Sequence, residues 1–122
     1  MEEQLSPLAL AFIGDAIHTA YVREEVLKRK HNKLSNYHNL AKRYCNAKKQ
    51  METLEAILPS LRDEEREVVR KARNSHSKHT AKNFDEETYK KATAFEALVG
   101  FLHLTQQNDR LNEILKISMK EE

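Results

Sequence analysis

Apolar residues recur along the chain at intervals of three and four, and this spacing predicts an almost entirely helical protein. With only two glycines and two prolines, few positions would interrupt a helix. Ser6 followed by Pro7 is typical of a helix start, so the first helix is expected over residues 7–30. The polar stretch at residues 31–35 should separate it from the next helix.

Five more segments carry apolar residues at helical spacing. Pro59 should end one of them, and Asp85 is expected to cap the longest, which has Glu86 and Glu87 in its first turn. Residues 74–85 lack apolar periodicity and are predicted to form an exposed loop. The five segments cover residues 37–47, 51–58, 61–74, 85–104 and 109–119.

The length of 122 residues suits a single domain spanning residues 1–122, with no internal repeat or linker. A domain of this size buries a smaller share of its surface than a larger one, so self-association would extend its core. Cys45 is the only cysteine, which excludes an intrachain disulfide and a four-cysteine zinc site. The N-terminus is acidic where a signal peptide is basic, and the apolar run at residues 8–14 is too short to span a bilayer. The expected location is the cytoplasm.

Positive charge is concentrated in two places, although the net charge is only +2. Residues 66–82 contain six basic side chains against one acid, Glu67. Such clustering favours a polyanionic partner, while solvated helix faces would explain the same charges equally well. The second cluster, which has no acid, comprises Lys42, Arg43, Lys48 and Lys49.

The two most apolar helices each carry one carboxylate near the middle. Within residues 8–17 every residue except Asp15 is apolar or glycine, and within residues 92–104 Glu96 is the only acid. These helices should form the centre of the core, where an unpaired carboxylate costs several kcal/mol or takes up a proton. Because Lys and Arg are absent from both helix centres, the pair predicts a site for Mg²⁺ or Mn²⁺, which prefer carboxylate oxygens.

Each of these features also has a structural explanation. Asp15 could accept a local hydrogen bond, and Glu96 could lie on a solvated helix edge. The coincidence of both with Gly14, which is costly inside a helix unless another backbone approaches, favours the metal site. His18 follows Asp15 by one turn and His103 follows Glu96 by two, so they could be ligands or proton carriers, but partly buried histidines without a catalytic role are more common.

The segments around the carboxylates resemble known signatures. LALAFIGDAIHTAYVR (residues 8–23) resembles the Gly-Asp-Ala helix of the ribonuclease III catalytic domain. YKKATAFEALVGFLHL (residues 89–104) resembles the second signature of that family, with Glu96 at its invariant glutamate. RNSHSKHTAKN (residues 73–83) resembles the basic loop of Mini-ribonuclease III, a subfamily that consists of the catalytic domain alone. The resemblance covers nearly the whole chain in order and spacing.

The resemblance implies an all-α ribonuclease III-like bundle that forms a homodimer, with two metal sites in one valley that accommodates an RNA duplex. Asp15 and Glu96 carry over as the catalytic, metal-binding residues, with Mg²⁺ as the expected cofactor and Mn²⁺ as the alternative. The implied reaction is hydrolysis of double-stranded RNA, and the typical substrate of the subfamily is precursor 23S ribosomal RNA. The implied RNA-contacting residues are Arg73, Asn74, Ser77, Lys78, Thr80, Lys82 and Asn83.

Two departures from the family pattern leave questions open. Ala11 and Thr93 stand where full-length ribonuclease III enzymes carry two further carboxylates, which suits Mini-ribonuclease III but leaves the number of metal ions open. The loop conformation is open as well, because lysine, glycine and proline are replaced by His76, Lys78 and Ala81.

Three other functions are open on the sequence. A non-catalytic helical dimer that binds structured RNA or ribosomal particles would explain the missing carboxylates at Ala11 and Thr93. A metal-dependent nucleotide hydrolase would also need buried carboxylates, although such enzymes usually carry more acids on facing helices. A protein–protein adaptor with solvated basic faces would leave Asp15 and Glu96 unexplained.

Overall fold

The computed structural model describes residues 5–29, 33–75 and 85–121. Within these residues the chain forms six α-helices, one turn of 3-10 helix and no strand, so the predicted all-helical class is confirmed. None of the described helices is long and apolar enough to cross a membrane. In chain order the elements are α1 (Pro7–Leu27), α2 (Leu34–Lys42), α3 (Ala47–Ile57), η1 (Leu58–Ser60), α4 (Asp63–Arg73), α5 (Glu86–Leu104) and α6 (Asn108–Ser118).

Two helices begin at the caps predicted from the sequence. The Ser6 hydroxyl accepts a hydrogen bond from the backbone N–H of Ala9 at 3.1 Å, at the start of α1. The Asp85 carboxylate accepts one from the backbone N–H of Thr88 at 2.7 Å, at the start of α5. Both caps satisfy N–H groups that have no partner inside the helix, which is why they are readable from local sequence.

The helical segment predicted over residues 37–47 extends too far at its C-terminal end. The chain leaves the helical conformation after Lys42, and α3 begins at Ala47. The Asn46 side chain fixes the new start, because its oxygen accepts a hydrogen bond from the backbone N–H of Lys49 at 2.9 Å and caps α3. The first helix also ends three residues before its predicted end, at Leu27.

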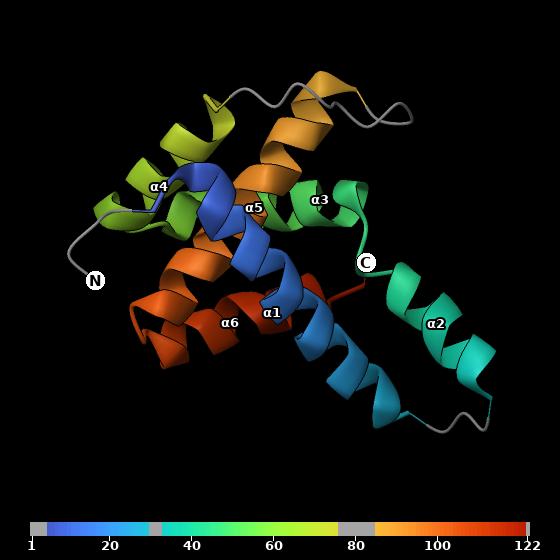
Figure 1. The fold of residues 1–122 in the computed structure, drawn as a ribbon. Helices are drawn as coiled ribbons and strands as arrows, with labels where there is room; N and C mark the ends of the chain where they lie inside the picture. The colour runs from blue at the N-terminus through green and yellow to red at the C-terminus, as the bar shows by residue number, and fades with distance from the viewer. Residues whose placement is uncertain (1–4, 30–32, 76–84, 122) are drawn as a thin grey trace.

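Helix α5 lies at the centre of the fold, with α1 crossing one side of it and α3 and α4 packed against others (Figure 1). Its buried side chains include Phe95, Leu98 and Leu102, which join the main core together with Leu54 and Ile57 of α3. Helix α2 lies apart, next to α1, where a smaller cluster forms around buried Tyr44 (Figure 1). The helix that carries Glu96 is therefore held from several directions.

The two glycines of the chain lie at the crossing of α1 and α5. A Cβ atom on Gly14 would lie 1.7 Å from the backbone oxygen of Glu96, and one on Gly100 would lie 2.0 Å from that of Leu10. Neither position has room for any side chain, so the two backbones touch there. The close approach predicted for Gly14 is confirmed, and it brings the middle of α1 against the middle of α5.

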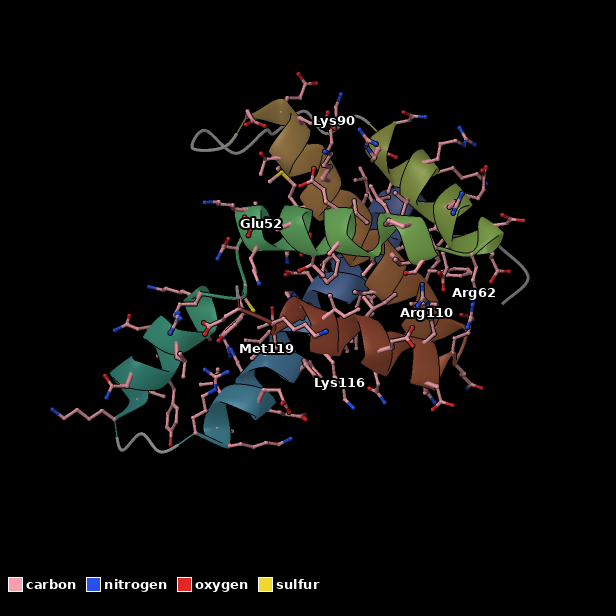
Figure 2. The ribbon with its side chains drawn as sticks, turned by 180° about the vertical axis from the view of Figure 1, so that it is seen from behind. Glu52, Arg62, Lys90, Arg110, Lys116 and Met119 are labelled. Atoms are coloured by element: carbon pink, nitrogen blue, oxygen red, sulfur yellow. The ribbon has the colours of Figure 1, made fainter. Side chains whose placement is uncertain are left out.

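A buried ion pair joins α4 to α6. Glu65 is 1% exposed, and the Arg110 guanidinium donates to both of its carboxylate oxygens at 2.9 Å. Glu65 also accepts from the backbone N–H of Arg62 at 3.0 Å, and Arg110 donates to the Ser60 carbonyl at 3.1 Å. Figure 2 shows Arg110 and Arg62 near each other at this end of the molecule. This pair joins residues 45 positions apart in the chain and was not predicted from the sequence.

Candidate active site

Asp15 and Glu96 lie side by side where α1 crosses α5. Gly14, next to Asp15, faces the backbone oxygen of Glu96 itself. The carboxyl group of Asp15 is close enough to that of Glu96 to raise its pKa. Residues far apart in the sequence thus form one acid pair, which is the arrangement that the metal-site prediction requires.

The acid pair lies nearer the surface than the sequence predicted. Glu96 is half-buried, but Asp15 is exposed, although both were expected in the centre of the core. The reason is that the apolar residues of α1 occupy more than one face of the helix. Ala11, Gly14 and His18 are buried, whereas Phe12 is 83% exposed. A ligand from solvent can therefore reach the acid pair.

Glu96 has a raised pKa when no cation is bound. Burial and then the neighbouring Asp15 raise the pKa of Glu96 to about 8, while a hydrogen bond from Gln50 acts in the opposite direction. No Lys or Arg of the described residues is among the groups that shift this pKa. Two adjacent carboxyl groups cannot both ionise readily, so Glu96 holds a proton near neutral pH.

The acid pair fits a divalent metal ion with few protein ligands. Within the described residues, no group of three or more His, Cys, Asp and Glu side chains could hold a metal ion. Mg²⁺ commonly keeps several waters and binds through one or two carboxylates together with substrate phosphate. Buried Ala11 and half-buried Thr93 add no further charge. Asp15 and Glu96 are therefore the residues that would hold Mg²⁺ or Mn²⁺.

Gln50 is a further residue of the site that the sequence analysis missed. It lies in the first half of α3, is 7% exposed, and places its amide nitrogen 3.5 Å from a carboxylate oxygen of Glu96. The same nitrogen is 3.2 Å from Nδ1 of His18. Its position in the sequence could have indicated this role, because Gln50 is a polar residue on the same helix face as buried Leu54 and Ile57.

His18 is more deeply buried than expected, with 1% of its surface exposed. Its ring contacts Phe95 edge-on, with 5.0 Å between the ring centroids. Burial lowers the pKa of His18 to about 4, and Asp15 opposes this shift only in part. His18 is therefore neutral at physiological pH and unsuited to carry a proton there. His103 is exposed in the last turn of α5.

A basic pocket of about 300 Å³ opens between η1, α4 and the start of α5. Figure 2 shows Lys90 on α5, beside α4. The acid Glu87 pairs with Arg73 at its rim. Of the predicted RNA-contacting residues, Arg73 and Asn74 line the pocket, and the other five lie outside the described residues. The basic side chains of the pocket are Arg66, Arg70, Arg73 and Lys90.

An apolar stripe lies on the surface at the start of α1. Leu5, Leu8 and Phe12 are 38%, 42% and 83% exposed, and they recur at helical spacing. Phe12 precedes Asp15 by three residues, so the stripe runs up to the acid pair. Large apolar side chains gathered on a surface commonly mark an interaction site.

Comparisons with known proteins agree with the fold and the signatures. The family described as Ribonuclease III domain matches residues 8–107. A Mini-ribonuclease 3 from a Thermoanaerobacter species is 40% identical over 95% of this chain and 82% of its own length. The Mini-ribonuclease 3 of Enterococcus faecalis is 41% identical over 97% of this chain and 91% of its own. A crystal structure of a Fusobacterium nucleatum protein superposes with a TM-score of 0.85 and 29% identity, covering 94% of this chain and 92% of that one.

Proposed function

The chain belongs to the ribonuclease III family, in its Mini-ribonuclease 3 group, and on that premise we propose that it cleaves double-stranded RNA with a divalent metal ion held by Asp15 and Glu96. Membership in this family makes the chain an endoribonuclease. The observation that carries the proposal is the meeting of the two carboxylates at the glycine-lined crossing of α1 and α5.

The chemistry needs little from the protein beyond these two acids. A divalent cation bound there would lower the pKa of a coordinated water and offset negative charge on the phosphate under attack. Asp15 and Glu96 supply the oxygen ligands, and Glu96 must release its proton when the cation binds. Because the pKa of Glu96 is about 8 without the cation, metal affinity should rise with pH up to that value.

The basic pocket supports a duplex RNA substrate. Four cationic side chains line it, and three of them form ion pairs with the exposed acids Glu67, Glu86 and Glu87. Because exposed ion pairs are weak, these cations can exchange them for contacts to phosphates, which position a duplex without reading its sequence. Lys90 precedes Glu96 by six residues on α5, or about 9 Å along the helix axis. Contacts made mostly by Arg and Lys release counterions, so RNA binding should weaken strongly as salt is raised. Binding that is independent of salt would contradict this surface.

The apolar stripe supports a homodimer. A second copy packed on Leu5, Leu8 and Phe12 would cover surface that is unfavourable to expose. It would also bring two acid pairs close together, since Phe12 lies one turn from Asp15. Two such sites suit the two strands of a duplex. The substrate expected from the resemblance, precursor 23S ribosomal RNA, would place this activity in the cytoplasm.

Cleavage of a long RNA duplex in Mg²⁺ tests the function directly. Wild type should cut it, while Asp15→Asn and Glu96→Gln should bind the duplex and leave it intact, because each loses a metal ligand. Fluorescence anisotropy would measure binding in the same samples, and a precursor 23S fragment would be compared with an unrelated duplex of equal length. If wild type binds duplex RNA but does not cut it with Mg²⁺ or Mn²⁺, a non-catalytic RNA-binding module is the better interpretation.

The dimer is tested separately by light scattering coupled to size-exclusion chromatography. Phe12→Glu should convert a dimeric wild type to a monomer, because it places a charge in the stripe. Leu104→Glu is the matched control, since Leu104 is also exposed, at 43%, but lies outside the stripe. A monomeric wild type, or equal effects of the two substitutions, would contradict the proposed interface.

A further inference from the structure

We propose that Gln50 is a positioning residue for the acid pair, holding the Glu96 carboxylate in place to bind the metal ion, and that His18 in turn holds the Gln50 amide. The inference rests on the proposed function, because it assigns Glu96 to the metal. It adds a supporting contact from α3 to a site otherwise built from α1 and α5.

The amide nitrogen of Gln50 has an acceptor for each of its two hydrogens. That nitrogen is 3.2 Å from Nδ1 of His18 and 3.5 Å from a carboxylate oxygen of Glu96. Because a side-chain amide nitrogen carries two N–H groups, one can serve each neighbour. The contact to Glu96 is long, as hydrogen bonds at active sites often are before the reacting ligands bind.

His18 and Glu96 both face the amide nitrogen of Gln50. A neutral imidazole with its proton on Nε2 offers a lone pair at Nδ1, and only the amide nitrogen can donate to it. An imidazolium would oppose one N–H to another, and Nε2 is buried with no hydrogen-bond partner among the described residues. If the amide were reversed, its oxygen would face the Glu96 carboxylate and repel it. A neutral His18 with its proton on Nε2 therefore fits the orientation in which Gln50 donates to Glu96.

Glu96 needs such support because its neighbours do not otherwise hold it. The adjacent Asp15 repels it whenever both are ionised, and Asp15 itself is exposed. Gln50 is fixed in turn by its helix, since Leu54 and Ile57 anchor α3 in the core. Residues that orient metal ligands in this way typically change metal affinity or activity by about 10- to 100-fold when replaced.

Mn²⁺ binding without RNA, measured by titration calorimetry, tests the proposal without relying on activity. Gln50→Leu keeps the side-chain volume but removes both donors, so Mn²⁺ affinity should fall about 10- to 100-fold. Thr53→Val is the matched control, because Thr53 is 3% exposed on the same helix and its hydroxyl donates to the Lys49 carbonyl. This control should bind Mn²⁺ as wild type does. In cleavage assays Gln50→Leu should lower kcat with little change in KM, since buried Gln50 does not face the RNA.

A double-mutant cycle tests the role of His18. His18→Leu should weaken Mn²⁺ binding less than Gln50→Leu does. It keeps the Gln50 amide and only allows that amide to rotate. The double variant should bind no more weakly than Gln50→Leu alone, since His18 acts through Gln50. Losses that multiply would overturn this order. If circular dichroism shows that Gln50→Leu does not fold, Gln50→Asn and His18→Leu decide the matter, and wild-type affinity in both would overturn the proposal.

The remaining outcomes separate this inference from the proposed function. If wild type itself does not bind Mn²⁺, the metal site fails and the inference fails with it. If wild type binds Mn²⁺ and cuts RNA while Gln50→Leu binds Mn²⁺ equally well, only the positioning role is overturned. A loss as large in Thr53→Val as in Gln50→Leu would assign the effect to the packing of α3 and would also overturn it.

Discussion

Glu65 and Glu96 are both acids on helices that pack into the interior, yet their surroundings are opposite. Glu65 receives two hydrogen bonds from Arg110 at 2.9 Å and one from the backbone of Arg62 at 3.0 Å. Glu96 faces the carboxyl group of Asp15, and the hydrogen bond it receives from Gln50 is 3.5 Å long. Glu65 is thus surrounded by hydrogen-bond donors, whereas Glu96 has few.

The pKa values of the two acids diverge accordingly. Burial alone would raise both, but at Glu65 the hydrogen bonds from Arg110 and Arg62 outweigh it and hold the pKa below its usual value. At Glu96 burial and Asp15 act together and raise the pKa to about 8. The α4–α6 contact thus satisfies its charge within the chain, whereas the α1–α5 crossing leaves its charge to be satisfied by a bound cation.

The largest effect is expected from closing the space at the α1–α5 crossing. Gly14→Ala places a Cβ atom 1.7 Å from the backbone oxygen of Glu96, and neither backbone can move without separating the helices. The expected cost is at least about 5 kcal/mol, which approaches the whole stability of a small domain. Urea unfolding followed by circular dichroism would measure it.

Ala20→Gly is the control for Gly14→Ala. Ala20 is exposed on the same helix, so its replacement costs only helix propensity, about 1 kcal/mol. Propensity alone would make Gly14→Ala stabilising. A variant of Gly14 that is as stable as wild type would therefore show that the backbones do not touch.

The second largest effect is expected from removing Arg110, the cation of the ion pair between α4 and α6. Arg110→Met should cost about 3 to 5 kcal/mol, because it leaves the Glu65 carboxylate buried without its main partner. The double variant Glu65→Leu with Arg110→Met should recover much of that loss. Glu113→Gln removes only the exposed partner of Arg110 and should change stability by no more than about 0.5 kcal/mol. Equal effects of Arg110→Met and Glu113→Gln would contradict the assignment of this contact to stability.

The third effect is a pH dependence with opposite signs at the two acids. The pKa of Glu96 is about 8 in the folded chain and 4.5 in the reference state, so the folded chain binds more protons between these values. The contribution of Glu96 to the free energy of unfolding is therefore complete below pH 4.5 and is lost as pH rises through 8. The lowered pKa of Glu65 makes its contribution present above its ordinary pKa and lost as pH falls.

Thermal melts in EDTA would reveal the Glu96 contribution. Between about pH 5 and pH 8.5, wild type should lose roughly 2 kcal/mol relative to Glu96→Gln, a value below the full pKa shift because Glu96 is only half-buried. Asp15→Asn should show a smaller loss than wild type, since the Asp15 charge is part of the cause. Parallel pH profiles of wild type and Glu96→Gln would contradict the raised pKa of Glu96.

Features that depend on a few neighbouring residues were predictable. The caps at Ser6 and Asp85 act over three residues, and both are where the sequence placed them. Asp15 and Glu96 were recognised as anomalies because each interrupts an apolar run within its own helix. The break before α3 was missed, since the apolar pattern runs across it and the Asn46 cap is the opposing signal.

The sequence by itself therefore determined the helices, the identity of the two acids and the need for a glycine beside one of them, because these follow from local hydrogen bonding and periodicity. Only the tertiary structure decided that Asp15 is exposed and that Gln50 contacts both Glu96 and His18. It also decided that Arg110 pairs with Glu65. The physical reason is that burial and charge pairing depend on which helices cross and at what depth. No residue's immediate neighbours in sequence carry that information.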